Sequence, residues 1–386
     1  MTSLTRQDRW LLPDGIEEVL PESAAKVELL RRRLLDLYAS WGYQQVIPPL
    51  VEFTESLLIG LGADIDLLTF RITDQVSGRS MGIRADITPQ VARIDAHSLA
   101  ADGVSRFCYA GSVLHTRASS LQRSRSPIML GAELYGDASQ QADIEIISLM
   151  LETLKAAGVT GITLDLGHVA IYRELLAQCG LDSEQEQAVF DALQRKSMPD
   201  LELALAGVDN AERSQQLLDL AHAHGDQSVL DQIDWAGEAV AALREVAQAV
   251  TARYPDVDVY FDLAELRGYH YHTGLVFAAY VAGHGQALAN GGRYDDVGEV
   301  FGRPRPATGF NTDLKALLTQ LSDPASPLPA GAISAPAGQD AALWAKLAEL
   351  RDDGEIVVTS LSGEIDPRCT RQLVQKGDKW TVEDIA

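Results

Sequence analysis

The stretch Leu266-Arg267-Gly268-Tyr269-His270-Tyr271-His272-Thr273-Gly274 places one arginine, two tyrosines, two histidines and two glycines within nine residues of a 386-residue chain. Two apolar runs flank it, at 257–261 and 275–280. A polar turn marked by glycine between two such runs predicts a hairpin edge or a strand corner. Polar aromatic side chains at a corner are suited to line a pocket. A surface turn rich in tyrosine and histidine is the alternative that this stretch alone leaves open.

The composition predicts a soluble globular protein with two or three domains, since 46% of residues are hydrophobic and 23% are charged. No apolar run is long enough to span a bilayer, and the first residues lack an apolar signal core, so we expect a cytoplasmic protein without membrane contact. The scattered cysteines Cys108, Cys179 and Cys369 predict neither disulfides nor a zinc site. We expect no cofactor and no metal. The net charge of −23 opposes binding of tRNA, because phosphate contacts need a basic surface.

The order of helical and strand patterns predicts an α+β fold. One domain is expected over residues 1–321, with a helical insertion at about 181–254. Residues 182–254 hold fourteen acidic and five basic residues, a net charge of −9, and give no strand signal. A proline-rich composition predicts a linker over 322–340. Residues 341–386 are then expected to form a small, truncated C-terminal α/β module.

Five segments in chain order resemble histidyl-tRNA synthetases: 12–21, 41–52, 83–90, 266–274 and 309–310. The third reads Ile83-Arg84-Ala85-Asp86-Ile87-Thr88-Pro89-Gln90, where those enzymes carry Leu-Arg-Pro-Glu-Gly-Thr. The resemblance implies a class II aminoacyl-tRNA synthetase-like antiparallel sheet with flanking helices, a helical insertion and a small α/β C-terminal module. It also implies a self-dimer through residues 22–52, which carry the helix and strand of the family's first motif.

The resemblance implies a weakened nucleotide site. A class II synthetase uses one arginine at the α-phosphate of ATP, an aromatic ring on the adenine and a second arginine near the γ-phosphate. In this chain those positions are taken by His115, Pro127 and Ala316. We interpret His115 as a strand histidine with satisfied hydrogen bonds, not as a catalytic base. Arg123 and Arg125 remain open, either as phosphate ligands or as solvated loop residues.

The resemblance also implies a largely retained amino-acid site. The residues that it assigns to histidine binding are Asp86, Thr88, Glu133, Arg267, Tyr271, His272 and Tyr294. Asp86 and Glu133 would meet the ammonium group and the imidazole, and Arg267 the carboxylate, a charge pattern that suits a zwitterion with a basic ring. His272 replaces a second tyrosine of the loop, and Met129 replaces a glutamine. From the residues alone, Asp86 could instead be a turn acceptor and Glu133 a solvated strand residue.

An acidic chain with a weakened ATP site and a short C-terminal module resembles the regulatory subunits of ATP phosphoribosyltransferase. The resemblance implies no catalysis by the chain itself. It implies a hetero-oligomer with the short-form catalytic subunit, an octamer of four plus four, and feedback inhibition by L-histidine in the first step of histidine biosynthesis. The insertion and residues 1–20 are candidate partner contacts. The alternative is a synthetase-like enzyme that activates histidine as an adenylate.

Overall fold

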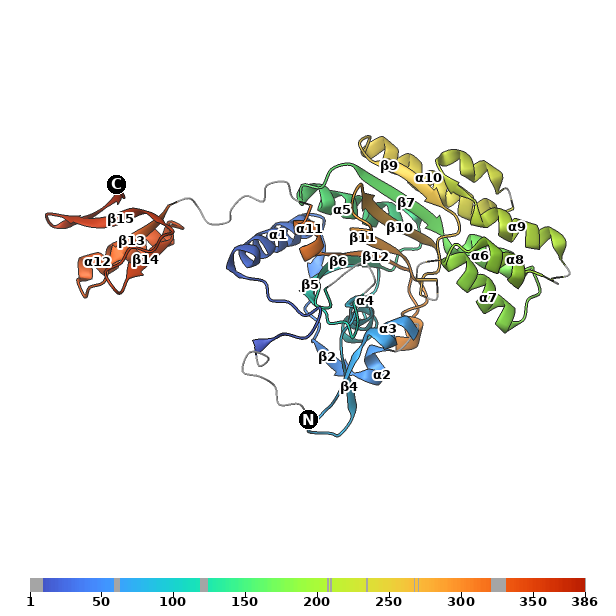
Figure 1. Ribbon diagram of the computed structural model, residues 1–386, viewed down its shortest axis with the longest axis horizontal. Helices are drawn as coiled ribbons and strands as arrows, with labels where there is room; N and C mark the ends of the chain where they lie inside the picture. The colour runs from blue at the N-terminus through green and yellow to red at the C-terminus, as the bar shows by residue number, and fades with distance from the viewer. Residues whose placement is uncertain are drawn as a thin grey trace. The chain divides into compact units, whose positions relative to one another are not determined.

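The computed structural model describes residues 10–58, 63–118, 124–206, 208, 210–233, 235–266, 268–269, 271–320 and 331–385. By their internal contacts the residues form two compact units (Figure 1). The larger comprises Met1–Glu18 and Leu30–Ser322, and the smaller comprises Val19–Leu29 and Asp323–Ala386. No helix in the described part of the chain is long and apolar enough to cross a membrane.

The larger unit is built on a nine-stranded sheet. Its strands, in spatial order, are β1 (Gln44–Gln45), β5 (Ser105–Ser112), β6 (Ile128–Tyr135), β12 (Ala307–Asp313), β11 (Ala289–Arg293), β10 (Leu275–Val281), β7 (Ile162–His168), β9 (Asp258–Asp262) and β8 (His224–Gly225). Only the pairs β1–β5 and β7–β9 are parallel, and the other neighbours are antiparallel. The expected α+β class with a mainly antiparallel sheet is therefore confirmed.

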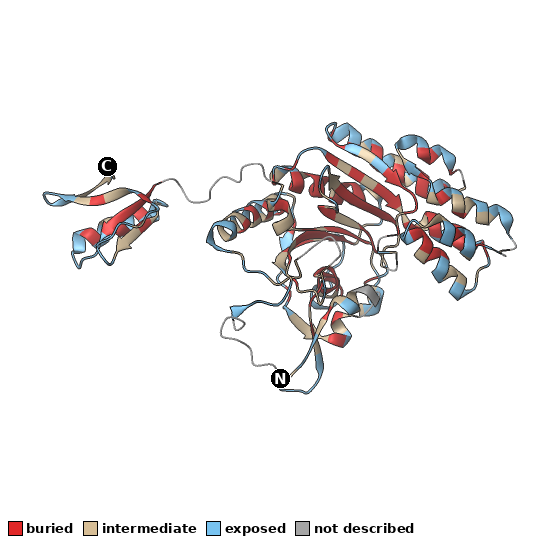
Figure 2. Cartoon of the chain, in the orientation of Figure 1, coloured by how far each residue is buried: buried red, intermediate tan, exposed pale blue. Residues whose placement is uncertain are grey.

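Helices cover one face of this sheet and form its core. Helix α5 (Gln140–Ala156) packs on β6, β10, β11 and β12, and α10 (Gly237–Arg253) packs on β7, β9 and β10. The side chains of α5 that point inward recur at helical spacing, as at Ile146, Met150 and Leu154, all without exposed surface. Helix α1 (Pro21–Ser40) adds Tyr38, whose ring meets Phe310 of β12 edge-on. Figure 2 shows the buried residues gathered on the central strands and on the helix faces turned toward them.

A second, three-stranded sheet leads the chain to the opposite face. It has the order β2 (Val51–Phe53), β4 (Ser80–Ile83), β3 (Phe70–Thr73), and the short helices α2 (Thr54–Leu57) and α3 (Ala63–Leu68) connect β2 to β3. Beyond β4 the chain enters α4 (Thr88–Arg93) and then a π-helical turn, Ile94–Leu99. The residues between β4 and α4 therefore lie where the small sheet meets the large one.

The insertion is helical for most of its length. It contains α7 (Ser183–Gln194), α8 (Met198–Ala204), α9 (Ala211–Ala221) and a 3₁₀ helix, Gln227–Gln232, and it follows α6 (Val169–Ala177). Helix α7 begins at a capping box in which Asp182 accepts from two backbone N–H groups and Gln185 accepts from the backbone of Asp182. The insertion was expected to contain no strand, and this is wrong for the two-residue strand β8. Helix α10 ends the insertion and packs on the large sheet through apolar residues that recur at helical spacing.

Of the two alternatives expected for residues 266–274, a hairpin edge or a strand corner, the hairpin is not formed, because β9 and β10 are not neighbours in the sheet. Strand β7 lies between β9 and β10 and pairs with both, so the chain between β9 and β10 crosses the end of β7. Sequence alternation locates strands, but it does not name their neighbours, because the pairing is decided by tertiary contacts. Tyr271 and His272, near the end of this stretch, lie at the edge of a cavity.

The smaller unit holds a four-stranded sheet with one helix. The strand order is β14 (Val357–Ser360), β13 (Ala332–Pro336), β15 (Cys369–Lys376), β16 (Lys379–Asp384), and the helix is α12 (Ala341–Asp352). Ile333, Leu347 and Leu373 belong to its separate hydrophobic core. The expected linker over 322–340 is therefore too long, because residues 332–336 are a central strand and Pro336 only ends it. Strand β16 pairs with β15 along its length and forms the last strand of this sheet.

Candidate functional site

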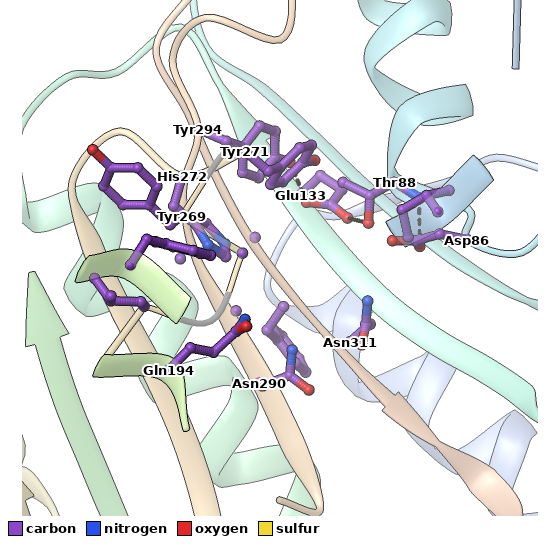
Figure 3. Close-up of a pocket in the computed structure, with 18 residues that line it drawn as sticks. Asp86, Thr88, Glu133, Gln194, Tyr269, Tyr271, His272, Asn290, Tyr294 and Asn311 are labelled. Atoms are coloured by element: carbon purple, nitrogen blue, oxygen red, sulfur yellow. Dashed lines mark hydrogen bonds between the residues drawn. The ribbon is translucent and has the colours of Figure 1, made fainter. Parts of the chain in front are cut away.

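A cavity of about 300 Å³ opens over β6, β12 and β11 on the face of the large sheet opposite α5 (Figure 3). It brings together six of the seven residues expected at a histidine site: Asp86, Thr88, Glu133, Tyr271, His272 and Tyr294. The seventh, Arg267, lies outside the described residues. These side chains come from the β4–α4 connection, from β6, and from the segments on either side of β10 and β11, so the fold joins positions far apart in the sequence.

Two glycines make the floor of the cavity. Gly309 of β12 pairs with Glu133 of β6 on one side and with Gly292 of β11 on the other. A Cβ atom at Gly309 would overlap Oε2 of Glu133, and one at Gly292 would lie 2.7 Å from the ring of His272. The bare backbone here is what lets the Glu133 carboxylate and the His272 ring lie flat against the sheet. Neither glycine was expected from the sequence to have this role.

Glu133 is a buried carboxylate surrounded by hydroxyl groups, and only 1% of its surface is exposed. Its Oε1 accepts from Thr88 Oγ1 at 2.9 Å and from the Tyr109 hydroxyl at 3.0 Å, and its Oε2 accepts from the Tyr294 hydroxyl. Burial raises the pKa of Glu133 to about 8, although the three hydroxyl donors oppose the shift. The alternative of a solvated strand residue is wrong. Tyr109, buried on β5, was missed because its place in the strand looks like ordinary core.

Nothing positively charged among the described residues pairs with this carboxylate, whose donors are all neutral. A buried acid in that position is held partly neutral and gains from any ligand that brings an N–H group or a positive charge. The cavity at Glu133 is therefore prepared for a cationic or N–H-donating ring.

Asp86 combines a structural role with a place in the cavity wall. Its Oδ1 accepts from the backbone N–H of Ile87 at 2.5 Å and of Thr88 at 3.1 Å, just before α4. The turn-acceptor interpretation is therefore correct for this oxygen. No described residue donates to the other carboxylate oxygen, and the side chain is half-buried at the cavity. The two interpretations of Asp86 are compatible.

Aromatic rings form the wall beside Glu133. Tyr271 stacks on Tyr294 with 4.9 Å between ring centroids and 30° between planes, and His272 meets Tyr271 edge-on at 5.4 Å. The hydroxyl of Tyr271 is buried, and no described group bonds to it. The alternative of a solvent-exposed surface turn is therefore wrong for the part of the stretch that the structure describes.

The helical insertion contributes to the same wall. Tyr269 meets Tyr172 of α6 edge-on at 5.2 Å and Phe190 of α7 at 5.4 Å, and Phe190 itself lines the cavity. Arg173 of α6 donates to the carbonyl of His272 at 3.2 Å and lies 5.3 Å from the ring of Tyr269. Helix α6 and the first helix of the insertion, α7, thus hold the loop over the cavity. The sequence carries no signal for these contacts, which join residues about eighty to a hundred positions apart.

The three replaced nucleotide positions offer no group for a phosphate. His115 Nε2 bonds to the Ala85 carbonyl at 2.9 Å, so the histidine is satisfied as expected, although it lies in an isolated bridge to Thr69 beyond the end of β5 and not in a strand. Pro127 accepts from the backbone of Val113, and Ala316 lies in α11 (Leu314–Leu318). Arg125 is used structurally, with Nε donating to the His115 carbonyl at 2.9 Å. Arg123 lies outside the described residues.

A single group of side chains in the described part of the chain has the spacing of metal ligands: Asp165, Asp262 and Glu265. Lys196 already forms an ion pair with Asp262 at 2.7 Å, which balances part of the negative charge. We assign no metal to this group.

The order of the sheet and the motifs matches known proteins. A family model described as histidyl-tRNA synthetase matches residues 15–317. A crystal structure named as an ATP phosphoribosyltransferase regulatory subunit/histidyl-tRNA synthetase from Bacillus halodurans aligns with a TM-score of 0.80 at 25% identity, over 92% of this chain and 94% of that one. Fold and site thus define a protein of the histidyl-tRNA synthetase class.

The remaining comparisons narrow the class. The model described as the ATP phosphoribosyltransferase subunit HisZ C-terminal domain matches residues 330–383. A regulatory subunit of ATP phosphoribosyltransferase from Pseudomonas syringae pv. tomato is 53% identical over 98% of this chain and 99% of its own. The chain belongs to the family of ATP phosphoribosyltransferase regulatory subunits. An ATP phosphoribosyl transferase (HisG:HisZ) complex from Thermotoga maritima shares the fold, with a TM-score of 0.59 at 18% identity over 74% of this chain and 96% of that chain.

Proposed function

We propose that this regulatory subunit binds L-histidine in the cavity and transmits that binding to a short-form ATP phosphoribosyltransferase catalytic subunit as feedback inhibition of histidine biosynthesis. The observation that carries the proposal is Glu133, a buried acid with three hydroxyl donors and no described cation at the end of an amino-acid-sized cavity. All the described donors to this carboxyl group are hydroxyl groups, and an imidazole ring would add an N–H donor.

The other expected residues have roles in keeping with this ligand. Asp86 offers its second oxygen to the ammonium group, with Thr88 beside it. Tyr271 offers a buried hydroxyl that has no described partner. His272 borders the ring pocket, and Arg267 is assigned to the carboxylate by family resemblance. The volume of about 300 Å³ suits a small ligand of this size.

Feedback inhibition requires that histidine bind two states of the complex with different affinities, since a ligand that binds both equally shifts nothing. The contacts of Tyr269 with Tyr172 and Phe190 support one route, because an ordered loop would fix α6 and α7. The acidic insertion is accordingly our candidate for partner contact, together with residues 1–20.

The proposed assembly is an octamer of four regulatory and four catalytic subunits, with a self-dimer of this chain through residues 22–52. Ile47 is 84% exposed and Leu50 is 49% exposed in this segment, an apolar surface that a second copy would cover. The proposal places the protein in the cytoplasm without tRNA, membrane or cofactor partners, in keeping with its net charge of −23.

Calorimetric titration of L-histidine into the full chain tests the ligand. Asp86→Ala and Glu133→Ala should each weaken binding by about tenfold or more, since each removes a carboxyl group that hydrogen-bonds the ligand. Glu202→Ala on the exposed surface of α8 is the matched control and should bind like the unaltered chain. Undiminished binding in both cavity variants would remove the proposed site.

The regulatory step needs its own assay. Adding the unaltered chain should raise the activity of the short-form catalytic subunit, and histidine should suppress that gain only while Glu133 is present. Co-purification of the two subunits gives the stoichiometry. A pyrophosphate-exchange assay with histidine and ATP decides the synthetase-like alternative, which His115, Pro127 and Ala316 oppose, and substantial exchange would overturn our choice.

A further inference from the structure

Two asparagines stand side by side at the end of the cavity away from the tyrosines. Asn290 of β11 and Asn311 of β12 are direct partners in the antiparallel register. Both are half-buried, both line the cavity, and Figure 3 shows their side chains apart from Glu133, Tyr271 and Tyr294. The side-chain amide of neither asparagine forms a hydrogen bond with another described residue. The cavity thus has a second polar end whose hydrogen-bonding capacity is unused.

The strand register sets the distance between the two polar ends. Glu133 pairs with Gly309, and Asn311 lies two residues further along the same strand. With neighbouring strands about 4.8 Å apart and a rise of about 3.4 Å per residue, the Cα atoms of Glu133 and Asn311 lie about 8 Å apart. Glu133 and both asparagines line the same cavity, together with Gly309 and Gly292. An amino acid lying along this diagonal, with its ring at Glu133, would bring its other end to the asparagines.

Charge decides which group of the ligand lies there. The Asp86 carboxylate repels a second carboxylate at its end of the cavity, so the carboxylate of a zwitterion is driven toward the opposite end. Each asparagine offers two N–H donors, and two facing amides can direct one N–H to each oxygen of a carboxylate. Because an amide carries no charge, less desolvation is needed when a carboxylate binds to it than when a carboxylate binds to a buried ion. The amides would then select the carboxylate by the positions of their N–H groups.

We propose that Asn290 and Asn311 form the carboxylate subsite of this cavity and so make the protein select the free amino acid over an analogue that lacks the carboxylate. The inference rests on the proposed binding of histidine. It adds to the role that the family resemblance assigns to Arg267, because it gives the carboxylate two donors on neighbouring strands of the sheet.

The test compares two ligands by calorimetry on the full chain. L-histidinol keeps the imidazole and the ammonium group of L-histidine but has an alcohol in place of the carboxylate. The unaltered chain should bind histidine at least tenfold more tightly than histidinol. The double variant Asn290→Ala, Asn311→Ala should lose most of this preference, through weaker binding of histidine and unchanged binding of histidinol. Asn311→Asp, nearly the same shape, should weaken histidine binding further, since it places an acid against the carboxylate.

Controls separate the possible failures. Melting temperatures of the variants within a few degrees of that of the unaltered chain show that the sheet is intact. If the double variant is unstable, Asn311→Ser replaces it in the same comparison of the two ligands. Histidine binding with full preference retained in the double variant, or an equal loss for both ligands, overturns the asparagine subsite alone. No binding of histidine by the unaltered chain overturns the proposed function and the subsite with it.

Discussion

Arg293 and Asp143 form a buried ion pair, with 3.0 Å between guanidinium and carboxylate, on the face of β11 opposite the cavity. Arg293 also donates to the Ser139 carbonyl at the start of α5, and its own carbonyl accepts from the backbone of Thr273 at 2.7 Å. The next residue is Tyr294, which bonds to Glu133 within the cavity. One arginine therefore ties the helix behind the sheet to the loop and the ring in front of it.

Replacement of this arginine should be severe. Arg293→Met would leave Asp143 buried without its partner, at a cost of about 3–5 kcal/mol in the free energy of unfolding. Histidine binding should weaken as well, because the end of β11 that leads to Tyr294 loses its side-chain anchor to the start of α5. Arg244→Met removes an exposed ion pair with Asp231 and should cost less than about 1 kcal/mol. Denaturant unfolding of both variants makes the comparison, and equal small losses would contradict the anchoring role.

A single methyl group on the cavity floor should abolish ligand binding. Gly309→Ala would place Cβ against Oε2 of Glu133, so the carboxylate must leave its hydroxyl partners or the strand must shift. Overpacking of this kind costs about 1–3 kcal/mol. Gly285→Ala is the matched control, because nothing lies within 4 Å of a Cβ there. Calorimetry and thermal melting should show a loss of binding and a lower melting temperature for the first variant alone. Normal histidine binding by Gly309→Ala would show that Glu133 is not needed in this position.

Stability should fall with rising pH because of Glu133. Burial raises the pKa of this side chain from 4.5 to about 8, so the folded chain holds a proton that the unfolded chain has released. The neutral form favours folding, and its contribution is fully present below pH 4.5 and is lost as the pH rises through about 8. Within this window the slope is about 1.4 kcal/mol per pH unit.

Glu133→Gln cannot titrate and should therefore show a flatter profile of melting temperature between pH 5 and 8. Glu202→Gln on the exposed surface of α8 should follow the unaltered chain at every pH. Parallel profiles for the unaltered chain and Glu133→Gln would mean that Glu133 is not held neutral.

Most strands and helices could be located from the sequence, since their patterns are local. The apolar runs at 257–261 and 275–280 correspond to β9 and β10, and the insertion expected at about 181–254 is helical for most of its length. The six cavity residues could be assembled because a family resemblance carried each position separately. The sequence did not predict which strands are neighbours in the sheet or where the C-terminal module begins. The position of β7 between β9 and β10, and the strand at 332–336, depend on contacts that no local pattern encodes.

The parts of the site that were missed share one physical feature. Tyr109, Gly309 and Phe190 gain their meaning only from their neighbours across the sheet or from another helix. A buried tyrosine is ordinary core until its hydroxyl meets a carboxylate. Asn290 and Asn311 each look like a polar interruption of a strand, and only the register makes them a pair. These residues could not be predicted because the groups that they contact are distant in the sequence, although the contacts themselves are ordinary hydrogen bonds and packing.

Histidine affinity should be greatest between about pH 6.5 and 8. The free imidazole has a pKa of about 6.5, and in the empty cavity burial raises the pKa of Glu133 to about 8. In the complex one proton is shared between the ring nitrogen and the carboxylate. Between these two values the neutral ring finds a protonated Glu133, so the proton is already present and binding needs no net exchange.

Outside that window binding carries a proton cost. Below about pH 6.5 ring and carboxyl both hold a proton, and one must be released; above about 8 neither does, and one must be taken up. Affinity should therefore decline on both sides by about tenfold per pH unit. Calorimetry from pH 5.5 to 9 measures the profile. Glu133→Gln carries no such proton and should lose the alkaline decline, apart from the part due to titration of the ligand's own ammonium group. An alkaline limb of equal size in both proteins would show that Glu133 does not share the ligand's proton.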